Sequence, residues 1–303
     1  MIVEVDNLSH LYGSRKALDG LSFRVEKGRI FGLLGPNGGG KSTLFRILAT
    51  MMAPSTGSAR IAGFDVVSAS SAVRRRIGVV FQTQSLDRKL TVGENLRAQG
   101  HLFGFSGADL SKRLEVALAR MRLGDRRDDP VDTLSGGLKR RVEIAKALMH
   151  EPQVLLMDEP STGLDPGVRR ELSQHIEELR ATRGVTVLLT THILEEAERC
   201  DRLLLIHQGR RVAEGSPAEL KSRVGGDVVE METIARDGLP EQIRQRFQVE
   251  PQVIDGHIRV EIADGHRFIA SVMEAFPGAI TSIQLHKPTL EDVFLDETGE
   301  HLT

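Results

Sequence analysis

Between an apolar stretch and an amphipathic one, this chain carries the sequence Gly-Pro-Asn-Gly-Gly-Gly-Lys-Ser-Thr at residues 35–43. The preceding run, Arg29–Leu34, is almost continuously apolar, as in a strand buried on both faces of a parallel sheet. After the loop, apolar residues recur at helical spacing, at Leu44, Ile47, Leu48 and Met51. A strand, a glycine-rich turn and a helix in this order predict an α/β fold with its chemistry at the carboxyl ends of the strands.

The same segment fits the phosphate-binding pattern G-x-x-x-x-G-K-[ST]. Its glycines allow successive backbone N–H groups to converge on phosphate oxygens, and the helix N-terminus adds a favourable field. Lys41 would place a positive charge at the β- and γ-phosphates, and the Ser42 hydroxyl would ligate Mg²⁺. The alternative is a glycine-rich turn before an ordinary helix. The predicted nucleotide-binding residues of the loop are Gly35, Pro36, Asn37, Gly38, Gly39, Gly40, Lys41, Ser42 and Thr43.

Composition limits the remaining possibilities. The chain has 303 residues, 40% of them hydrophobic, which suits one large and one small domain. Its net charge of −2 gives no overall basic field to attract nucleic acid or an anionic membrane. The single cysteine, Cys200, excludes an internal disulfide and a cysteine-rich metal site, and favours a reducing compartment. We expect no secretory signal, and the apolar runs fall short of the ~20 residues that span a bilayer, so another chain would supply any membrane-spanning part.

Further apolar runs organise the chain into two domains. Additional buried strands are predicted at Val154–Met157, Thr186–Leu189 and Arg202–Ile206. A helical insert is expected at about 83–150, and glycines near positions 215 and 225 indicate a linker. Beyond the linker, an alternating strand at 258–262 lies between helical patterns at 241–247 and 267–276. We therefore expect a large α/β domain over residues 1–222 and a small α+β domain over residues 223–303.

A second motif closes one of these strands. The apolar run Val154–Met157 ends in the adjacent acids Asp158 and Glu159, which point to opposite sides of the backbone. Asp158 would hold the Mg²⁺ through water, and Glu159 would polarise the attacking water as general base. Acidic residues commonly end strands at a protein surface, so this motif alone is weak evidence. It becomes persuasive because the same chain carries the phosphate-binding loop.

A third motif, Ser135-Gly136-Gly137, precedes a helix whose apolar face contains Leu138 and Val142. Serine is well placed there as the N-cap, and such a helix start is another anion-binding element. The simpler interpretation is a capped helix start. Because the glycine-rich loop already supplies one phosphate site, a second one in the same chain requires an explanation.

These motifs together resemble a known family. The loop at 35–43 and then Ser135-Gly136-Gly137, Asp158-Glu159, Asp165 and His192 resemble, in order, the Walker A, signature, Walker B, D-loop and switch-histidine motifs of ABC ATPases. The resemblance covers about residues 1–222. One small departure is Gly39, where relatives usually carry Ala or Ser, and which should loosen the loop slightly.

The resemblance implies further site residues and a second copy of the chain. Gln82 resembles the Q-loop glutamine, a catalytic group and Mg²⁺ ligand beside Ser42 and Asp158, and Tyr12 resembles the aromatic residue that stacks on adenine. Together with Glu159 and Gln82, His192 would act in catalysis by contacting the γ-phosphate. In the implied head-to-tail homodimer, residues 135–137 of one subunit close over the phosphate held by the partner, with Asp165 at the seam. ATP and Mg²⁺ are the implied cofactors.

A closer resemblance rests on Val224-Gly225-Gly226-Asp227 and on the tail segment 287–294, Lys-Pro-Thr-Leu-Glu-Asp-Val-Phe. Both are similar to the daunorubicin-resistance type of exporter ATPase, which implies a separate membrane permease, a peripheral position on the cytoplasmic face, and efflux of a drug-like or lipophilic compound. The alternative is a soluble ABC ATPase acting on nucleic acid or ribosomes, although no nucleic acid is expected as a partner. A GTPase is disfavoured because no asparagine is followed by lysine, as guanine selection requires.

Overall fold

The computed structural model describes residues 1–233, 238–254 and 256–302. Two compact units divide the chain, Met1–Ser216 and Pro217–Leu302. The second unit begins earlier than the expected boundary at 222–223, because helix α8 (Pro217–Lys221) packs against α11 (Leu290–Thr298) of the same unit. No helix in the described ranges combines the length and the apolar character needed to cross a bilayer.

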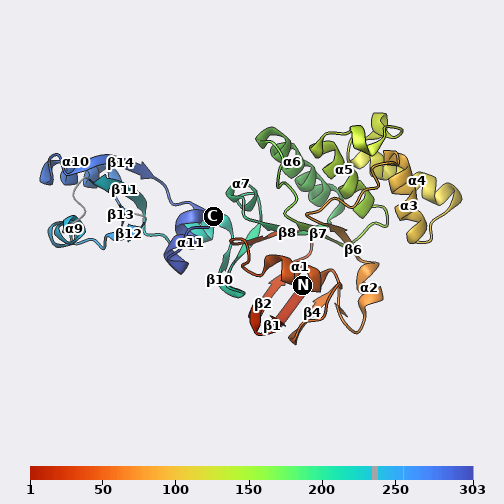
Figure 1. The fold of residues 1–303 in the computed structure, drawn as a ribbon, viewed down its shortest axis with the longest axis horizontal. Coiled ribbons are helices and arrows are strands. Elements are labelled where there is room, and N and C mark those ends of the chain that lie inside the picture. Colours follow the sequence, from red (N-terminus) through yellow and green to blue (C-terminus); the bar gives the residue numbers. More distant parts are fainter. Residues whose placement is uncertain (234–237, 255, 303) are drawn as a thin grey trace. The chain divides into compact units, whose positions relative to one another are not determined.

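The first unit contains the strands and helices that build the expected α/β domain (Figure 1). Its elements are β1 (Val3–Tyr12), β2 (Arg15–Val25), β3 (Ile30–Leu34), α1 (Lys41–Leu48), β4 (Thr56–Ile61), β5 (Phe64–Asp65), α2 (Ser70–Arg74), β6 (Ile77–Val80), α3 (Val92–Leu102), α4 (Gly107–Arg120), the 3₁₀ helices η1 (Gly124–Arg126) and η2 (Val131–Thr133), α5 (Gly136–Ala147), β7 (Val154–Asp158), α6 (Pro166–Arg183), β8 (Thr186–Thr191), α7 (Leu194–Ala197), β9 (Arg202–His207) and β10 (Arg210–Gly215).

A six-stranded sheet in the order β10-β9-β3-β8-β7-β6 forms the centre of this unit. Its strands run parallel except β10, which pairs antiparallel with β9. Every residue of β3, β7 and β8 is buried, which explains the apolar runs of β3 and β7 and the apolar centre of β8, Val187–Leu189. The α/β fold expected from the sequence is confirmed, and the carboxyl ends of β3, β7 and β8 meet at one edge of the sheet.

A second, antiparallel sheet in the order β2-β1-β4-β5 accompanies the central sheet. Helix α1 lies between the two sheets (Figure 1), and one apolar core joins all three layers. Leu21 and Phe23 of β2, Phe45 of α1 and Leu33 of β3 are all buried in this core. The helix that follows the glycine-rich loop is therefore fixed from both sides.

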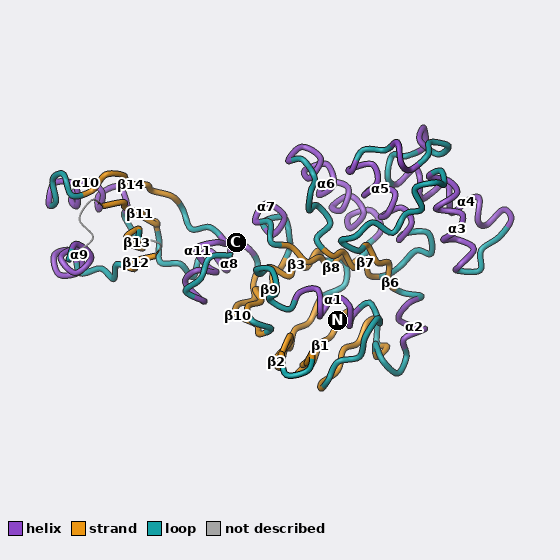
Figure 2. Tube along the Cα trace, viewed as in Figure 1, coloured by secondary structure: helices purple, strands orange, loops and turns teal. Residues whose placement is uncertain are grey.

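Helices α3, α4 and α5 form the helical insert, and Figure 2 shows them grouped beyond β6. Thr91 starts α3 with a capping box, in which its side chain accepts from the Glu94 N–H while the Glu94 carboxylate accepts from the Thr91 N–H. Helix α5 begins at Gly136, directly after the N-cap Ser135, and its buried side chains face the rest of the unit.

The second unit is a small α+β unit. Besides α8 and α11 it contains β11 (Asp227–Thr233), α9 (Leu239–Phe247), β12 (Gln252–Ile254), β13 (His257–Ile262), α10 (Gly265–Ala275) and β14 (Ile280–His286). Its antiparallel sheet has the order β12-β13-β11-β14. Val229, Met231 and Val260 face α9 and α10 in a separate apolar core. Side chains at alternating positions, such as Glu230 and Arg259, lie on the opposite face.

Candidate functional site

The turn between β3 and α1 can be built only with glycine at two positions. Gly40 is the N-cap of α1 with φ 106°, and a Cβ there would lie 2.6 Å from the Ala17 carbonyl oxygen. A Cβ on Gly35 would lie 2.1 Å from the Ile206 carbonyl oxygen, because the loop passes directly over β9. These close approaches fix the loop at the carboxyl end of β3, with the N-terminus of α1 directly beyond it.

Lys41 is held by the loop that it closes. Its Nζ donates hydrogen bonds to the carbonyl oxygens of Gly35 at 2.6 Å and Pro36 at 3.0 Å. The side chain is only 4% exposed, and this burial lowers the pKa of Lys41, opposed by the nearby charges of Glu159 and Asp158. The ammonium group lies 3.9 Å from Oε1 of Glu159. The loop lysine and the acidic pair at the end of β7 therefore belong to one site.

A pocket of about 220 Å³ opens beside this lysine. Its lining residues are Tyr12, Arg15, Ala17, Asn37, Gly38, Gly40, Lys41, Ser42, Thr43, Arg46 and Glu159. Most of them belong to the predicted loop, and Tyr12 is brought in from the end of β1. Arg15 and Arg46 also line the pocket, although the sequence analysis did not predict them. Arg15 could have been suspected from its position three residues after Tyr12. A larger hollow of about 500 Å³ over β1 and β2 lies apart from the loop and the acidic pair.

Glu159 stands in an unusual backbone conformation. Its φ of 44° lies in the left-handed region, which a residue with a side chain adopts only when its surroundings enforce it. Here the Glu159 N–H donates to both the carbonyl oxygen and Oγ1 of Thr190, at 3.2 and 2.9 Å. The Thr190 hydroxyl in turn donates to Oδ1 of Asp158 at 2.6 Å, and burial raises the pKa of Asp158. Thr190, which the sequence did not single out, thus locks both acids to β8.

Both carboxylate oxygens of Glu159 have side-chain neighbours from distant segments. Oε2 accepts hydrogen bonds from Nε2 of Gln82 and from Oγ1 of Thr162, each at 3.1 Å. Oε1 lies 3.3 Å from Nδ1 of His192. The predicted residues Gln82, Lys41 and His192 therefore surround one buried glutamate, as general-base chemistry requires.

The residues predicted to act across a dimer lie elsewhere. Ser135 is exposed at the N-terminus of α5, where its Oγ accepts from the Leu138 N–H at 3.3 Å. Asp165 is exposed at the N-cap position of α6. Neither these residues nor Gly136 and Gly137 line the pocket beside Lys41. Within one chain, the helix start at Ser135 is thus separate from the pocket beside Lys41.

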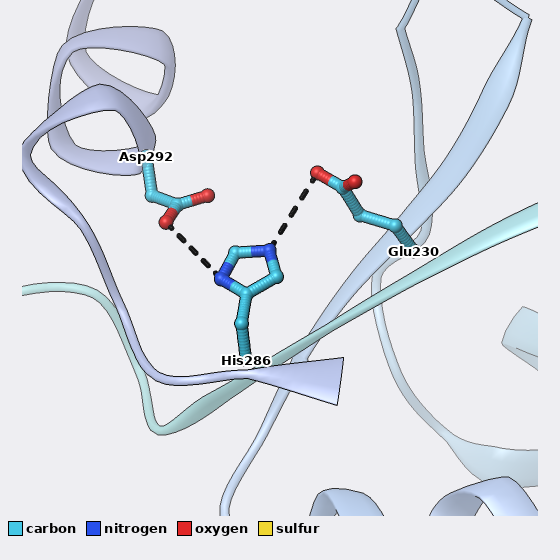
Figure 3. Close-up of side chains that lie close together, drawn as sticks. All are labelled: Glu230, His286 and Asp292. Atoms are coloured by element: carbon cyan, nitrogen blue, oxygen red, sulfur yellow. Dashed lines mark ion pairs between the residues drawn. The ribbon is translucent and has the colours of Figure 1, made fainter. Parts of the chain in front are cut away.

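The second unit contains its own group of titratable side chains, Glu230, His286 and Asp292 (Figure 3). His286 lies between the two carboxylates, with Nε2 3.8 Å from Glu230 and Nδ1 3.7 Å from Asp292. Asp292 already accepts hydrogen bonds from the Thr289 N–H and hydroxyl, both at 2.7 Å, and from Arg259 at 3.3 Å. Because the two ring nitrogens face different acids and a buried guanidinium lies beside them, this group suits an ion-paired link to α11 rather than a metal site.

Comparison with known proteins agrees with this geometry. Residues 18–162 match the family described as ABC transporter, and residues 215–298 match the C-terminal domain of DrrA1-3-like ATP-binding proteins. The Nod factor export ATP-binding protein I of Paraburkholderia xenovorans is 42% identical over 99% of this chain and 98% of its own. The daunorubicin resistance ATP-binding protein DrrA3 of Streptomyces coeruleorubidus is 38% identical over 98% of this chain and 96% of its own.

A solved structure extends the agreement to three dimensions. The dimeric ATP-binding cassette MJ0796 bound to ADP and Pi superimposes with a TM-score of 0.64 and 28% identity, over 71% of this chain and 98% of its own. The matched sequence, the fold and the residues around Glu159 lead to the same assignment. The chain belongs to the ABC transporter family of ATP-binding proteins, in the branch that carries a DrrA-like C-terminal domain.

Proposed function

We propose that this chain hydrolyses ATP beside Lys41 and powers the efflux of a drug-like or lipophilic compound through a separate membrane permease. The observation that carries the proposal is the environment of Glu159, a buried carboxylate held 3.9 Å from Lys41 and contacted by Gln82 and His192. The names of the relatives, which are export and resistance proteins, favour this reading over a soluble ATPase acting on nucleic acid.

Each contact of Glu159 has a use in hydrolysis. As general base, its carboxylate takes a proton from the water that attacks the γ-phosphorus. Lys41 binds the β- and γ-phosphates, and the loop N–H groups around it receive the remaining oxygens. His192 contacts the γ-phosphate. Tyr12, on the rim of the same pocket, stacks on the adenine.

The donor atoms of this site suit Mg²⁺. Ser42 offers a hydroxyl, Gln82 keeps its amide oxygen free while Nε2 donates to Glu159, and Asp158 offers the carboxylate oxygen that does not accept from Thr190. Oxygen ligands of this kind are the ones Mg²⁺ prefers. The ion would neutralise the phosphate charge, and the residues named here would orient it.

The exposed signature segment supports a head-to-tail dimer. Ser135, Gly136 and Gly137 form an anion-binding helix start away from the chain's own pocket. In the proposed dimer they close over the nucleotide of the partner, with Asp165 at the seam. The permease would hold this dimer at the cytoplasmic face of the membrane.

The direct test uses Glu159→Gln, which keeps the shape of the side chain but removes its basic oxygen. ATP should still bind, while turnover falls by about 100-fold or more. Glu178→Gln, which changes an exposed glutamate on α6, serves as the control and should hydrolyse ATP normally. When the chain is co-reconstituted with its permease, ATP-driven uptake of a lipophilic drug into inverted vesicles should require Glu159. Normal turnover by the Glu159→Gln variant would refute the assignment.

A further inference from the structure

One face of helix α5 contacts the segment that carries Gln82. Arg140, Glu143 and Lys146 follow one another at intervals of three along the helix, so their side chains lie on the same side. All three reach the stretch Phe81–Ser85, which leaves the sheet at the end of β6.

Arg140 holds the backbone of Gln82 and of the residue before it. Nη1 donates to the Phe81 carbonyl oxygen at 2.6 Å, and Nη2 donates to the Gln82 carbonyl oxygen at 3.3 Å. The same guanidinium pairs with Oε2 of Glu143 at 2.8 Å. Two carbonyl groups that have left the sheet are therefore oriented by one planar side chain.

Glu143 and Lys146 hold the other end of the segment. Oε1 of Glu143 accepts a hydrogen bond from the Ser85 N–H at 2.7 Å, and Nζ of Lys146 donates to the Ser85 carbonyl oxygen at 2.7 Å. The backbone on both sides of the Gln82 side chain is thus bound to α5. We call this set of contacts, made by Arg140, Glu143 and Lys146, the α5 clamp.

The clamp is costly to build, which argues that it does more than stabilise the fold. Arg140 is 6% exposed and Glu143 is 3% exposed. Burial lowers the pKa of Arg140 and raises the pKa of Glu143, so loss of hydration outweighs their mutual attraction for each group. A buried pair of this kind is commonly replaceable by apolar side chains without loss of stability. Apolar side chains in its place could not hold the Phe81–Ser85 backbone in a fixed position, as this pair does.

We propose that Arg140 and Glu143 are positioning residues, which hold the Gln82 amide against Glu159 and join it rigidly to the signature serine. This inference rests on the proposed ATPase function. Gln82 reaches Glu159 at 3.1 Å, and Ser135 caps the N-terminus of the same α5 that carries the clamp. Gln82, which contacts the chain's own catalytic glutamate, is therefore joined through α5 to Ser135. Ser135 is the serine proposed to contact the partner's nucleotide, so the two residues move as one body.

The test compares two identical substitutions at neighbouring arginines of α5. Arg140→Lys keeps a cation beside Glu143 but cannot donate to both carbonyl groups of the Gln82 segment. Arg141→Lys is the matched control, because Arg141 likewise donates to two carbonyl oxygens, those of Met121 and Arg122, away from Gln82. We expect Arg140→Lys to lower kcat by about 10- to 100-fold with an unchanged Kd for ATP, as for a misplaced catalytic group. Arg141→Lys should leave kcat within about threefold.

Glu143→Ala with hydrogen exchange provides a readout that does not depend on turnover. The Ser85 amide should exchange at least tenfold faster once its acceptor is removed, in a peptide covering residues 81–88, while peptides from the glycine-rich loop stay unchanged. Unchanged exchange in this peptide would overturn the clamp itself. Faster exchange with normal kcat, or an equal loss of kcat in Arg140→Lys and Arg141→Lys, would overturn the positioning role. Wild-type chain without ATPase activity would instead refute the proposed function.

Discussion

The side-chain amide of Gln82 donates a hydrogen bond to Oε2 of Glu159 across 3.1 Å, although 77 residues separate the two in sequence. The contact exists because β6 and β7 are parallel neighbours, so that the residues following each strand emerge at the same edge of the sheet. It connects Glu159, the proposed general base, to the segment held by the α5 clamp. The effects on kcat of substitutions at Gln82, Glu159 and Arg140 should therefore be non-additive in double-mutant cycles.

Lys41→Ala should weaken ATP binding itself. The buried ammonium group is the charged donor of the phosphate loop, and a charge-assisted contact of this kind is worth about 1.5–3 kcal/mol. That corresponds to a roughly 10- to 150-fold higher Kd for ATP, measured by calorimetry. Lys112→Ala on α4, far along the chain from the loop, serves as control. An unchanged Kd in Lys41→Ala would contradict the assignment of the loop.

Tyr12 should act through its ring rather than its hydroxyl. The residue is 44% exposed, and its hydroxyl donates to the Met52 sulfur at 3.5 Å, a weak acceptor. Tyr12→Phe should therefore bind ATP like the wild type. Tyr12→Ala should raise the Kd several-fold, as expected for about 1 kcal/mol of lost aromatic contact. Equal losses in the two variants would show that the hydroxyl or the local fold matters instead.

Asp227 should make the stability of the C-terminal unit depend on pH in acid. The Lys287 ammonium group and the Gly265 N–H bind its carboxylate and hold its pKa below the usual 3.8. A carboxyl whose pKa is depressed by folding stabilises the fold above its unfolded pKa, and this contribution is lost as the pH falls through the folded value. Asp227→Asn should thus lower the urea midpoint at pH 7, and the difference from wild type should shrink below about pH 4. A difference that persists unchanged at pH 2.5 would exclude this origin.

Much of the candidate nucleotide site could be predicted from the sequence, because its elements are local. The glycine-rich loop is one run of consecutive residues, and so is β7 with the two acids that end it. A buried strand is recognisable in the sequence as a run of apolar residues. Gln82 and His192 were assigned to the site only through the family resemblance, since neither has a local pattern of its own, and their contacts with Glu159 come from the structure.

Other features could not be predicted because they depend on tertiary contacts. Thr190 looks like any threonine in a strand, and only the pairing of β7 with β8 brings it to Asp158. Arg140 and Glu143 look like solvent-exposed helix charges, yet both are buried against the segment after β6. The residues between Pro217 and the expected start of the C-terminal unit at 223 show the same dependence, because a short helix such as α8 is assigned to a unit by its packing rather than by its sequence.

The composite site can be tested most directly by mixing two defective chains. Ser135→Arg keeps a sound Lys41 loop but spoils the site of its partner, and Lys41→Ala has the opposite defect. Each variant alone has two damaged sites, so neither should form an ATP-dependent dimer. In a mixed dimer, the intact loop of one chain faces the intact signature of the other, and light scattering should detect ATP-dependent dimers only in the mixture. If wild type dimerises with ATP and the mixture does not, the proposal that Ser135 acts across the dimer is contradicted.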